Sequence, residues 1–275
     1  MKLASTYDHQ GVQIFKFGSW PFGPPKMFSH CFYVDGLLID TGHRNMRKEV
    51  LQALGGLKVD QIFITHHHED HTGNIVELQA RFACPVLASA KCVELMKDPP
   101  PISFAQWMTW GSRPAFSGLS ETMDRLSTAN YNFEVYPVPG HAEDMLCLYE
   151  REQGWLFSAD LWVSDRIRYF MRPESVHQQI ESLKSVLQLD FELLFCSHNP
   201  QFKHGKQRLA NKLQFFEDFY GKVSSHYHQG LKPRQIMKEL GLKENWNIRL
   251  TSGGELSTLN MIKAVIRDEQ LLAPA

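Results

Sequence analysis

The segment THHHEDHTG at residues 65–73 constrains this chain more than any other part of it. Four histidines and two acidic residues fill six consecutive positions, directly after the apolar run at 62–64 that predicts a buried strand. A soluble core seldom gathers so many ionisable groups, because each needs a partner or a shifted pKa. His66 and His68 are two positions apart, so an extended backbone points both to one side, and Asp70 and His71 at the following turn can face the same space. The segment therefore predicts ligands for two adjacent metal ions.

The residue types in this segment also bear on which metal is bound. Imidazole nitrogens with carboxylate oxygens suit Zn²⁺, and they suit Mn²⁺ or Fe²⁺ when oxygen ligands are well represented. The segment contains no cysteine, which argues against a structural zinc site. A polar surface turn without metal is the alternative. We expect two divalent metal ions, with Zn²⁺ preferred over Mn²⁺ or Fe²⁺.

Isolated polar residues follow four other apolar runs, at the point where each predicted strand ends. They are Asp40, His141, Asp160 and His198, which follow the runs at 37–39, 135–138, 155–157 and 193–196. In α/β sheets, functional groups gather beyond the carboxyl ends of strands. These four side chains could therefore converge with the histidine segment.

The series of motifs resembles the metallo-β-lactamase-fold hydrolases. The matching motifs are IDTG at 39–42, THHHEDHTG at 65–73, PGH at 139–141, SAD at 158–160 and SH at 197–198. They stand in the order and spacing of that family, across residues 12–200. The resemblance implies an α/β (α+β) fold, a four-layer αβ/βα sandwich. It implies a catalytic domain at residues 1–205, followed by a helical extension at 206–275 with some likeness to a winged helix.

The resemblance also assigns roles to individual residues. His66, His68 and His141 would hold one metal, Asp70, His71 and His198 would hold the second, and Asp160 would bridge both. His67 and Glu69 occupy variable positions of the pattern and are expected outside the ligand set. Asp40 would orient the ligands from the neighbouring strand end. Asp70 and Asp160 would act catalytically by holding the attacking hydroxide.

The predicted metal pair favours hydrolysis without specifying the bond that is cleaved. Water between two divalent ions has its pKa lowered from about 15.7 to the neighbourhood of 7, so a hydroxide nucleophile exists at neutral pH. Our first hypothesis is a hydrolase of a small ester-like molecule, a thioester or a lactone. The alternative is a metal-dependent endoribonuclease or phosphodiesterase. A minor alternative is a metal-dependent binding protein without catalysis.

The C-terminal part of the chain is basic. Residues 203–249 hold ten Lys and Arg against four acidic residues, a net charge of +6, whereas the whole chain carries −1. On helices such a segment is usually a solvated face, but it can also attract phosphates. Binding that weakens steeply with salt would support the nuclease hypothesis. Helices are predicted here at 209–223, 233–240 and 258–271.

Substrate contacts are predicted from residues near the strand ends, with core packing or surface exposure as the alternative for each. The candidates are His30, Trp162, Arg166 and Tyr169, joined by Trp107, Trp110 and Arg168. The stretch 98–117, rich in proline and tryptophan, is predicted to be an irregular lid or pocket wall, or else a surface loop.

The remaining expectations concern location and partners. Five cysteines without a C-x-x-C pair suit free buried thiols in a reducing compartment. No apolar run approaches the about 18 residues of a membrane span, and no secretion signal is recognised. We expect a cytoplasmic protein with a small-molecule substrate and no membrane partner. RNA is the alternative partner, and a homodimer is left open.

Overall fold

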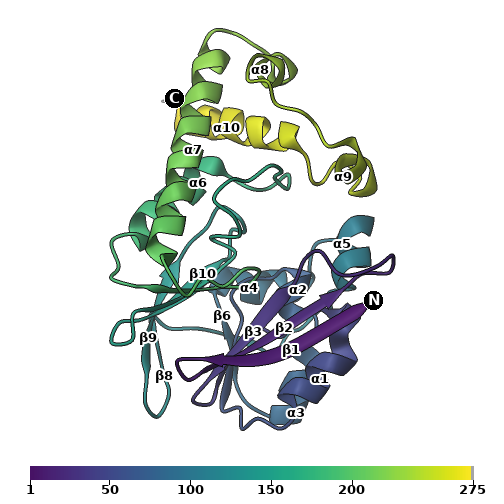
Figure 1. The fold of residues 1–275 in the computed structure, drawn as a ribbon, viewed down its shortest axis with the longest axis vertical. Coiled ribbons are helices and arrows are strands. Elements are labelled where there is room, and N and C mark those ends of the chain that lie inside the picture. Colours follow the sequence, from purple (N-terminus) through teal and green to yellow (C-terminus); the bar gives the residue numbers. More distant parts are fainter. Residues whose placement is uncertain (274–275) are drawn as a thin grey trace.

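The computed structural model describes residues 1–273, which form two β-sheets with helices on their outer faces (Figure 1). The larger sheet has the strand order β1-β2-β3-β4-β5-β6-β7. Its strands are β1 (Lys2–His9), β2 (Val12–Ser19), β3 (Ser29–Val34), β4 (Leu37–Ile39), β5 (Gln61–Phe63), β6 (Val86–Ala88) and β7 (Leu119–Glu121). The smaller sheet has the order β12-β11-β10-β9-β8. Its strands are β8 (Arg125–Ser127), β9 (Asn132–Pro137), β10 (Leu146–Glu150), β11 (Trp155–Ala159) and β12 (Leu193–Cys196).

The helices divide between the two outer faces. In the first two thirds of the chain they are η1 (Arg44–Met46), α1 (Arg47–Leu54), α2 (Glu69–Thr72), α3 (Ile75–Phe82), α4 (Ala90–Leu95) and α5 (Phe104–Trp110). In the last third they are α6 (Val176–Val186), α7 (Gly205–His228), α8 (Pro233–Glu239), α9 (Trp246–Thr251) and α10 (Thr258–Leu272). Figure 1 shows the chain from α7 onward rising above the sheets as a C-terminal lobe.

Three buried apolar clusters establish the order of the layers. One joins α1, α3 and α4 to the larger sheet. A second lies between the sheets and includes Phe32, Trp155 and Phe195. The third joins α6, α7 and α10 to the smaller sheet. Helices, sheet, sheet and helices thus follow one another, and the predicted four-layer sandwich is confirmed.

The turn between β3 and β4 shows why the larger sheet forms where it does. Asp35 and Gly36 both have positive φ, 47° and 86°. A two-residue hairpin of type I′ needs positive φ at both central positions, which Asp-Gly tolerates. The register pairs Val34 with Leu37 directly across this turn. The chain then crosses to β5 in parallel and delivers the histidine segment at the carboxyl end of that strand.

Two expectations about local structure are corrected. The stretch 98–117 is not irregular throughout, because it contains helix α5. Ser103 caps that helix in a reciprocal box with Gln106, which satisfies backbone donors despite the surrounding prolines. Strand β1 was not expected, because its side chains are exposed and show no apolar alternation, yet it pairs with β2 along its whole length. The short elements α4, α9, β7 and β8 were also not expected.

The C-terminal lobe begins with helix α7, whose first residue is Gly205. The domain division at 205/206 stays a prediction that lies one residue from this helix start. Helix α10 packs against both α6 and α7. Among residues 1–273, no helix combines the length and the apolar character that crossing a membrane would need.

Candidate metal centre

The predicted ligands come from loops at the carboxyl ends of β5, β9, β11 and β12. Two strand ends at the site have unusual backbone geometry: Asp40, after the neighbouring β4, has φ 63°, and Ala159, the last residue of β11 and directly before Asp160, has φ 47°. Positive φ costs free energy at residues other than glycine, and it persists where the surrounding structure demands it. Gly140 also has positive φ, 128°, and a Cβ there would lie 2.5 Å from the backbone nitrogen of Gln179. The close approach to helix α6 thus requires a glycine directly before His141.

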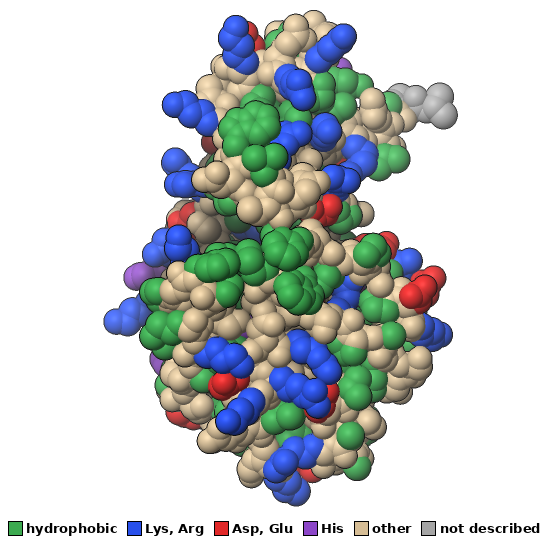
Figure 2. Space-filling model, turned by 90° about the vertical axis from the view of Figure 1, so that its right-hand side faces the viewer, with side chains coloured by type: hydrophobic (Ala, Val, Ile, Leu, Met, Phe, Trp, Pro, Cys, Tyr) green, Lys and Arg blue, Asp and Glu red, His purple; other side chains and the backbone are tan. Residues whose placement is uncertain are grey.

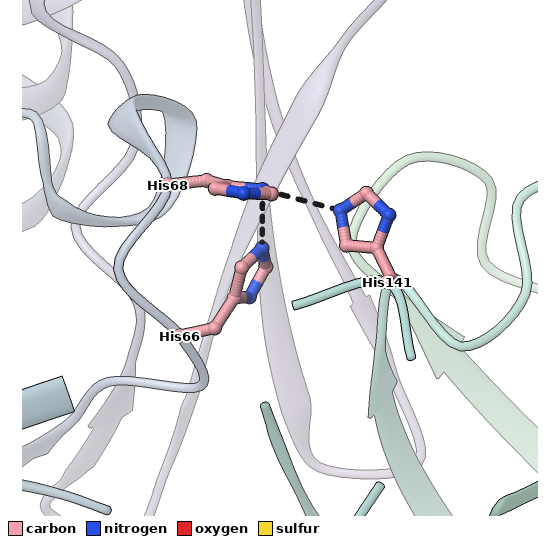
Figure 3. A group of neighbouring side chains, drawn as sticks. All are labelled: His66, His68 and His141. Carbon is pink, nitrogen blue, oxygen red and sulfur yellow. Dashed lines mark hydrogen bonds between the residues drawn. The ribbon is translucent and has the colours of Figure 1, made fainter. Parts of the chain in front are cut away.

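Three histidines form the first group (Figure 3). His66 Nε2 lies 3.0 Å from His68 Nδ1, and His141 Nε2 lies 3.1 Å from the same atom. Ligands about 2.0–2.1 Å from a tetrahedral ion lie roughly 3.3 Å from one another, so this spacing fits a bound metal. Burial lowers the pKa of His66 and His68 well below the usual value, which keeps both rings neutral and their lone pairs free.

Asp70, His71, Asp160 and His198 form the second group. His198 Nε2 lies 3.3 Å from Asp70 Oδ2 and 3.0 Å from Asp160 Oδ2. Asp160 Oδ2 also lies 3.5 Å from His141 Nε2 in the first group. The Asp160 carboxylate therefore touches both groups, as the bridging role requires.

Unsatisfied buried atoms test whether a cation fits here. Among the described residues, His71 Nε2 and Asp160 Oδ1 are buried without a hydrogen-bond partner, 3.6 Å apart. Burial opposes charge on His198, but Asp160 and Asp70 outweigh it and raise its pKa to about 9. Buried polar atoms aimed at one another without partners are costly unless a ligand satisfies them. Both groups thus offer the donor types that a divalent metal prefers.

Contacts outside the two groups orient the ligand rings. Asp40 Oδ2 accepts a hydrogen bond from His71 Nδ1 at 2.7 Å, and this leaves Nε2 facing the second group. Thr65 donates its backbone N–H to Asp40 Oδ1 at 2.9 Å, which holds the carboxylate in place. His198 Nδ1 donates to the Phe28 carbonyl at 2.7 Å. The predicted position of Asp40 next to the ligands agrees with this geometry.

We expect Asp40→Ala to weaken metal binding by about tenfold to a hundredfold, because His71 loses the partner that fixes its ring. Asp40→Asn retains an acceptor oxygen and should lose less. Competition with a metal-binding dye measures both variants against the unchanged protein. Equal affinities for Asp40→Ala and the unchanged protein would contradict the orienting role.

His67 and Glu69 belong to neither group and have other partners. His67 Nδ1 lies 2.8 Å from Asp144 Oδ1, and its backbone N–H donates to Asp144 Oδ2 at 2.7 Å. Glu69 lies 3.9 Å from the Arg113 guanidinium. Asp144 was not singled out from the sequence, because its partner is 77 residues away.

The predicted substrate residues divide into buried and accessible ones. His30 and Trp162 are buried; His30 Nδ1 bonds to the Ser197 carbonyl, and Trp162 Nε1 donates to Asp165. Arg166 and Arg168 are exposed and Tyr169 is half-buried. On α5, Trp110 stacks on the candidate ligand His198 with ring centroids 5.7 Å apart, whereas Trp107 is exposed. Helix α5 therefore walls one side of the metal centre.

A chain of hydrogen bonds joins His141 to the C-terminal lobe. His141 Nδ1 lies 3.3 Å from Glu174 Oε2, and Gln179 Nε2 donates to the same oxygen at 3.0 Å. Lys212 on α7 donates to Gln179 Oε1 at 3.1 Å and to the Leu161 carbonyl at 2.7 Å. These residues were not predicted, because no local motif marks such distant contacts.

The buried ammonium of Lys212 predicts a pH effect on stability. Burial lowers the pKa of Lys212 to about 8, against about 10.4 in an unfolded chain. Between these values the folded protein binds fewer protons, so the free energy of unfolding rises with pH across this window, by up to about 3 kcal/mol. Below pH 8 this contribution is lost. In urea unfolding at pH 8, 9 and 10, the free energy of unfolding of the unchanged protein relative to that of Lys212→Met should rise with pH, because the opposite contribution of His198 is common to both proteins. A difference that stays constant with pH would contradict this role of Lys212.

The fold and the candidate site together can be compared with known families. The fold is a two-sheet sandwich, and the site consists of histidine and aspartate side chains at its strand ends. Residues 25–124 match the family model described as the metallo-beta-lactamase superfamily. The family resemblance found in the motifs is therefore confirmed over these residues.

Individual proteins of similar sequence or structure allow a finer comparison than the family model. The hydroxyacylglutathione hydrolase of Aeromonas hydrophila is 28% identical over 229 residues, which cover 81% of this chain and 78% of that one. The protein of the same name from Aeromonas salmonicida is 26% identical with the same coverage. Among solved structures, a metallo-beta-lactamase from Pontibacter korlensis gives a TM-score of 0.64 at 20% identity, covering 78% of this chain and 99% of that one. The fold and the prediction of a metal-dependent hydrolase are thus confirmed.

Several finer expectations stay predictions. These are the metal identity, the binuclear centre, the homodimer, RNA as an alternative partner and the cytoplasmic location. The individual roles of the site residues also stay predictions.

Proposed function

We propose that this chain is a binuclear metal-dependent hydrolase of a small ester-like substrate, with a thioester preferred over a lactone. The observation that carries the proposal is the position of Asp160, 3.5 Å from His141 in one ligand group and 3.0 Å from His198 in the other. A carboxylate shared in this way is suited to hold two cations at once. The relatives support the thioester, since their name denotes hydrolysis of an acylated glutathione.

Two divalent ions held by these groups, Zn²⁺ or otherwise Mn²⁺ or Fe²⁺, would supply a hydroxide at neutral pH and stabilise negative charge on a carbonyl oxygen. The carboxylates of Asp70 and Asp160 can accept hydrogen bonds from an attacking water and fix its direction. Asp40 holds His71, and Glu174 holds His141, so that their Nε2 atoms face the centre. Trp110 covers His198 and excludes water from that side.

The test is hydrolysis of three substrates by the metal-loaded protein. They are an acyl-glutathione thioester, a lactone and a single-stranded RNA. We expect turnover of the thioester, with two metal ions per chain by elemental analysis. Cleavage of the RNA alone, suppressed by salt, would overturn the proposal in favour of a nuclease. A content of one ion per chain would overturn the binuclear centre.

A further inference from the structure

The C-terminal lobe and the adjoining Arg172 form a cavity that no candidate metal ligand lines. Its volume is about 570 Å³, and four cationic side chains line it: Arg172, Arg249, Lys263 and Arg267. A smaller groove of about 380 Å³ shares Arg249 and Lys263 with it and adds Lys232 and Arg234. Six cations therefore surround two adjoining hollows.

Only part of this positive charge is neutralised by the protein. Arg249 pairs with Glu244 at 3.0 Å, and Arg172 lies 3.6 Å from Glu255. Arg267 instead donates to backbone carbonyls, among them that of Arg172 at 2.8 Å. Within residues 1–273, Lys263 has no ion pair. A cavity with excess positive charge and guanidinium groups suits phosphate, because guanidinium matches the geometry of phosphate oxygens.

The glycines of this cavity hold one of its cations in place. Gly253 and Gly254 have positive φ, 60° and 78°. In this conformation their carbonyls accept hydrogen bonds from the Arg172 guanidinium, at 3.0 Å from Gly253 and 3.4 Å from Gly254. The arginine is therefore positioned before any ligand binds, which lowers the entropic cost of binding.

An exposed tryptophan stands beside the cations. Trp246 on helix α9 is 60% exposed, and the Arg249 guanidinium lies 5.4 Å from its ring centroid. Leu250, one turn further along the helix, is 72% exposed and lines the cavity. Figure 2 shows hydrophobic side chains of this lobe surrounded by Lys and Arg. An exposed aromatic face next to phosphate-binding cations can stack a nucleobase.

One residue that lines the cavity is close in sequence to a residue that contacts the metal centre. Arg172 is two residues from Glu174, whose carboxylate lies 3.3 Å from the ligand His141. Arg267 also donates to the Glu174 carbonyl. Figure 2 shows the surface hollowed between the C-terminal lobe and the sandwich. The lining of the cavity therefore contacts Glu174, a residue that itself contacts the metal centre.

We propose that this cavity binds the phosphates of a nucleotide-bearing thiol carrier, so that the preferred substrate is an acyl thioester of coenzyme A. The inference rests on the proposed thioester hydrolysis. The phosphates lie among Arg172, Lys263 and Arg267, and the adenine stacks on Trp246. The pantetheine arm, about as long as a four-residue extended peptide, or roughly 13–14 Å, leads the thioester toward the metal centre.

The reaction balances with water alone. Water adds at the acyl carbon, a C–O bond forms and the C–S bond breaks. The thiol leaves with one proton of the water, and the products are a carboxylic acid and the free thiol carrier. No oxidant or further reactant is needed.

The experiment compares three thioesters with the same acyl group, carried by coenzyme A, glutathione or N-acetylcysteamine. We expect the largest kcat/KM for the coenzyme A thioester. Lys263→Glu should raise its KM about tenfold with little change in kcat, and should leave the N-acetylcysteamine thioester unaffected. Lys222→Glu is the matched control, because it makes the same charge change at an exposed residue of α7 outside both hollows. The advantage of coenzyme A should shrink as salt rises.

The outcomes separate this inference from the proposed function. Hydrolysis of none of the three thioesters would overturn the proposed function. Hydrolysis of all three at equal kcat/KM, or a preference for glutathione, would overturn the inference alone. An equal effect of Lys263→Glu on all three would also overturn it, because the change would then act on the fold. RNA cleavage that depends on Lys263 would assign the cavity to a polynucleotide instead.

Discussion

Asp160→Ala is expected to abolish binding of both metal ions and to lower kcat/KM by about a thousandfold or more. The carboxylate touches both ligand groups, at 3.0 Å from His198 and 3.5 Å from His141. Removing it also takes away the counter-charge beside His71, whose Nε2 lies 3.6 Å from Asp160 Oδ1. Metal-bound catalysis contributes several kcal/mol to transition-state stabilisation, and each 1.36 kcal/mol corresponds to a factor of ten in rate. Elemental analysis and steady-state kinetics measure the two effects.

Asp165→Ala is the matched control for this variant. It is an aspartate on the same loop, but its carboxylate accepts from Trp162, Arg208 and Asn211 and not from any predicted ligand. It should keep two ions per chain and most of the activity. If Asp160→Ala retained both ions, its bridging role would be wrong.

The second large effect, a loss of metal and activity, is expected at His68 but not at the adjacent His67. His68→Ala should lose the ion of the three-histidine group and reduce activity about a thousandfold, because His68 Nδ1 lies 3.0 Å from His66 Nε2 and 3.1 Å from His141 Nε2. His67→Ala should keep both ions and most activity. Its imidazole bonds to the buried Asp144, so its removal should lower the free energy of unfolding by about 1–3 kcal/mol.

Metal content, activity and urea unfolding of the two variants test this pair. Because they differ by one position, any general disturbance of the loop affects both. Equal metal loss in the two variants would show that the assignment of ligands along the segment is shifted by one residue.

The candidate ligands could be proposed together because each follows an apolar strand and because the family resemblance singles these positions out. The histidine segment follows an apolar strand, and His141, Asp160 and His198 each follow another. Asp35-Gly36 is an equally local signal, since only its turn chemistry is needed to place β3 beside β4. The four-layer order followed from the family resemblance.

What could not be predicted depends on contacts between distant segments. Asp144 meets His67, and Lys212 reaches Gln179 from another helix, without any motif that marks the pair. Strand β1 has exposed side chains, so its pairing with β2 leaves no hydrophobic pattern in the sequence. Helix α5 is different, because Ser103 and Gln106 are a readable capping signal that the surrounding prolines obscured.

The hydrogen bonds from Lys212 through Gln179 and Glu174 to His141 connect the docking of helix α7 with the binding of metal. Helix α7 supplies no predicted ligand, yet its docking fixes the ring that would hold a metal. By thermodynamic reciprocity, whatever free energy the docked helix adds to metal affinity, the metal adds to the docking of the helix. Removing the metal should therefore weaken the docking of a lobe that contains none of the predicted ligands. The stability of that lobe then depends on the metal occupancy of the centre.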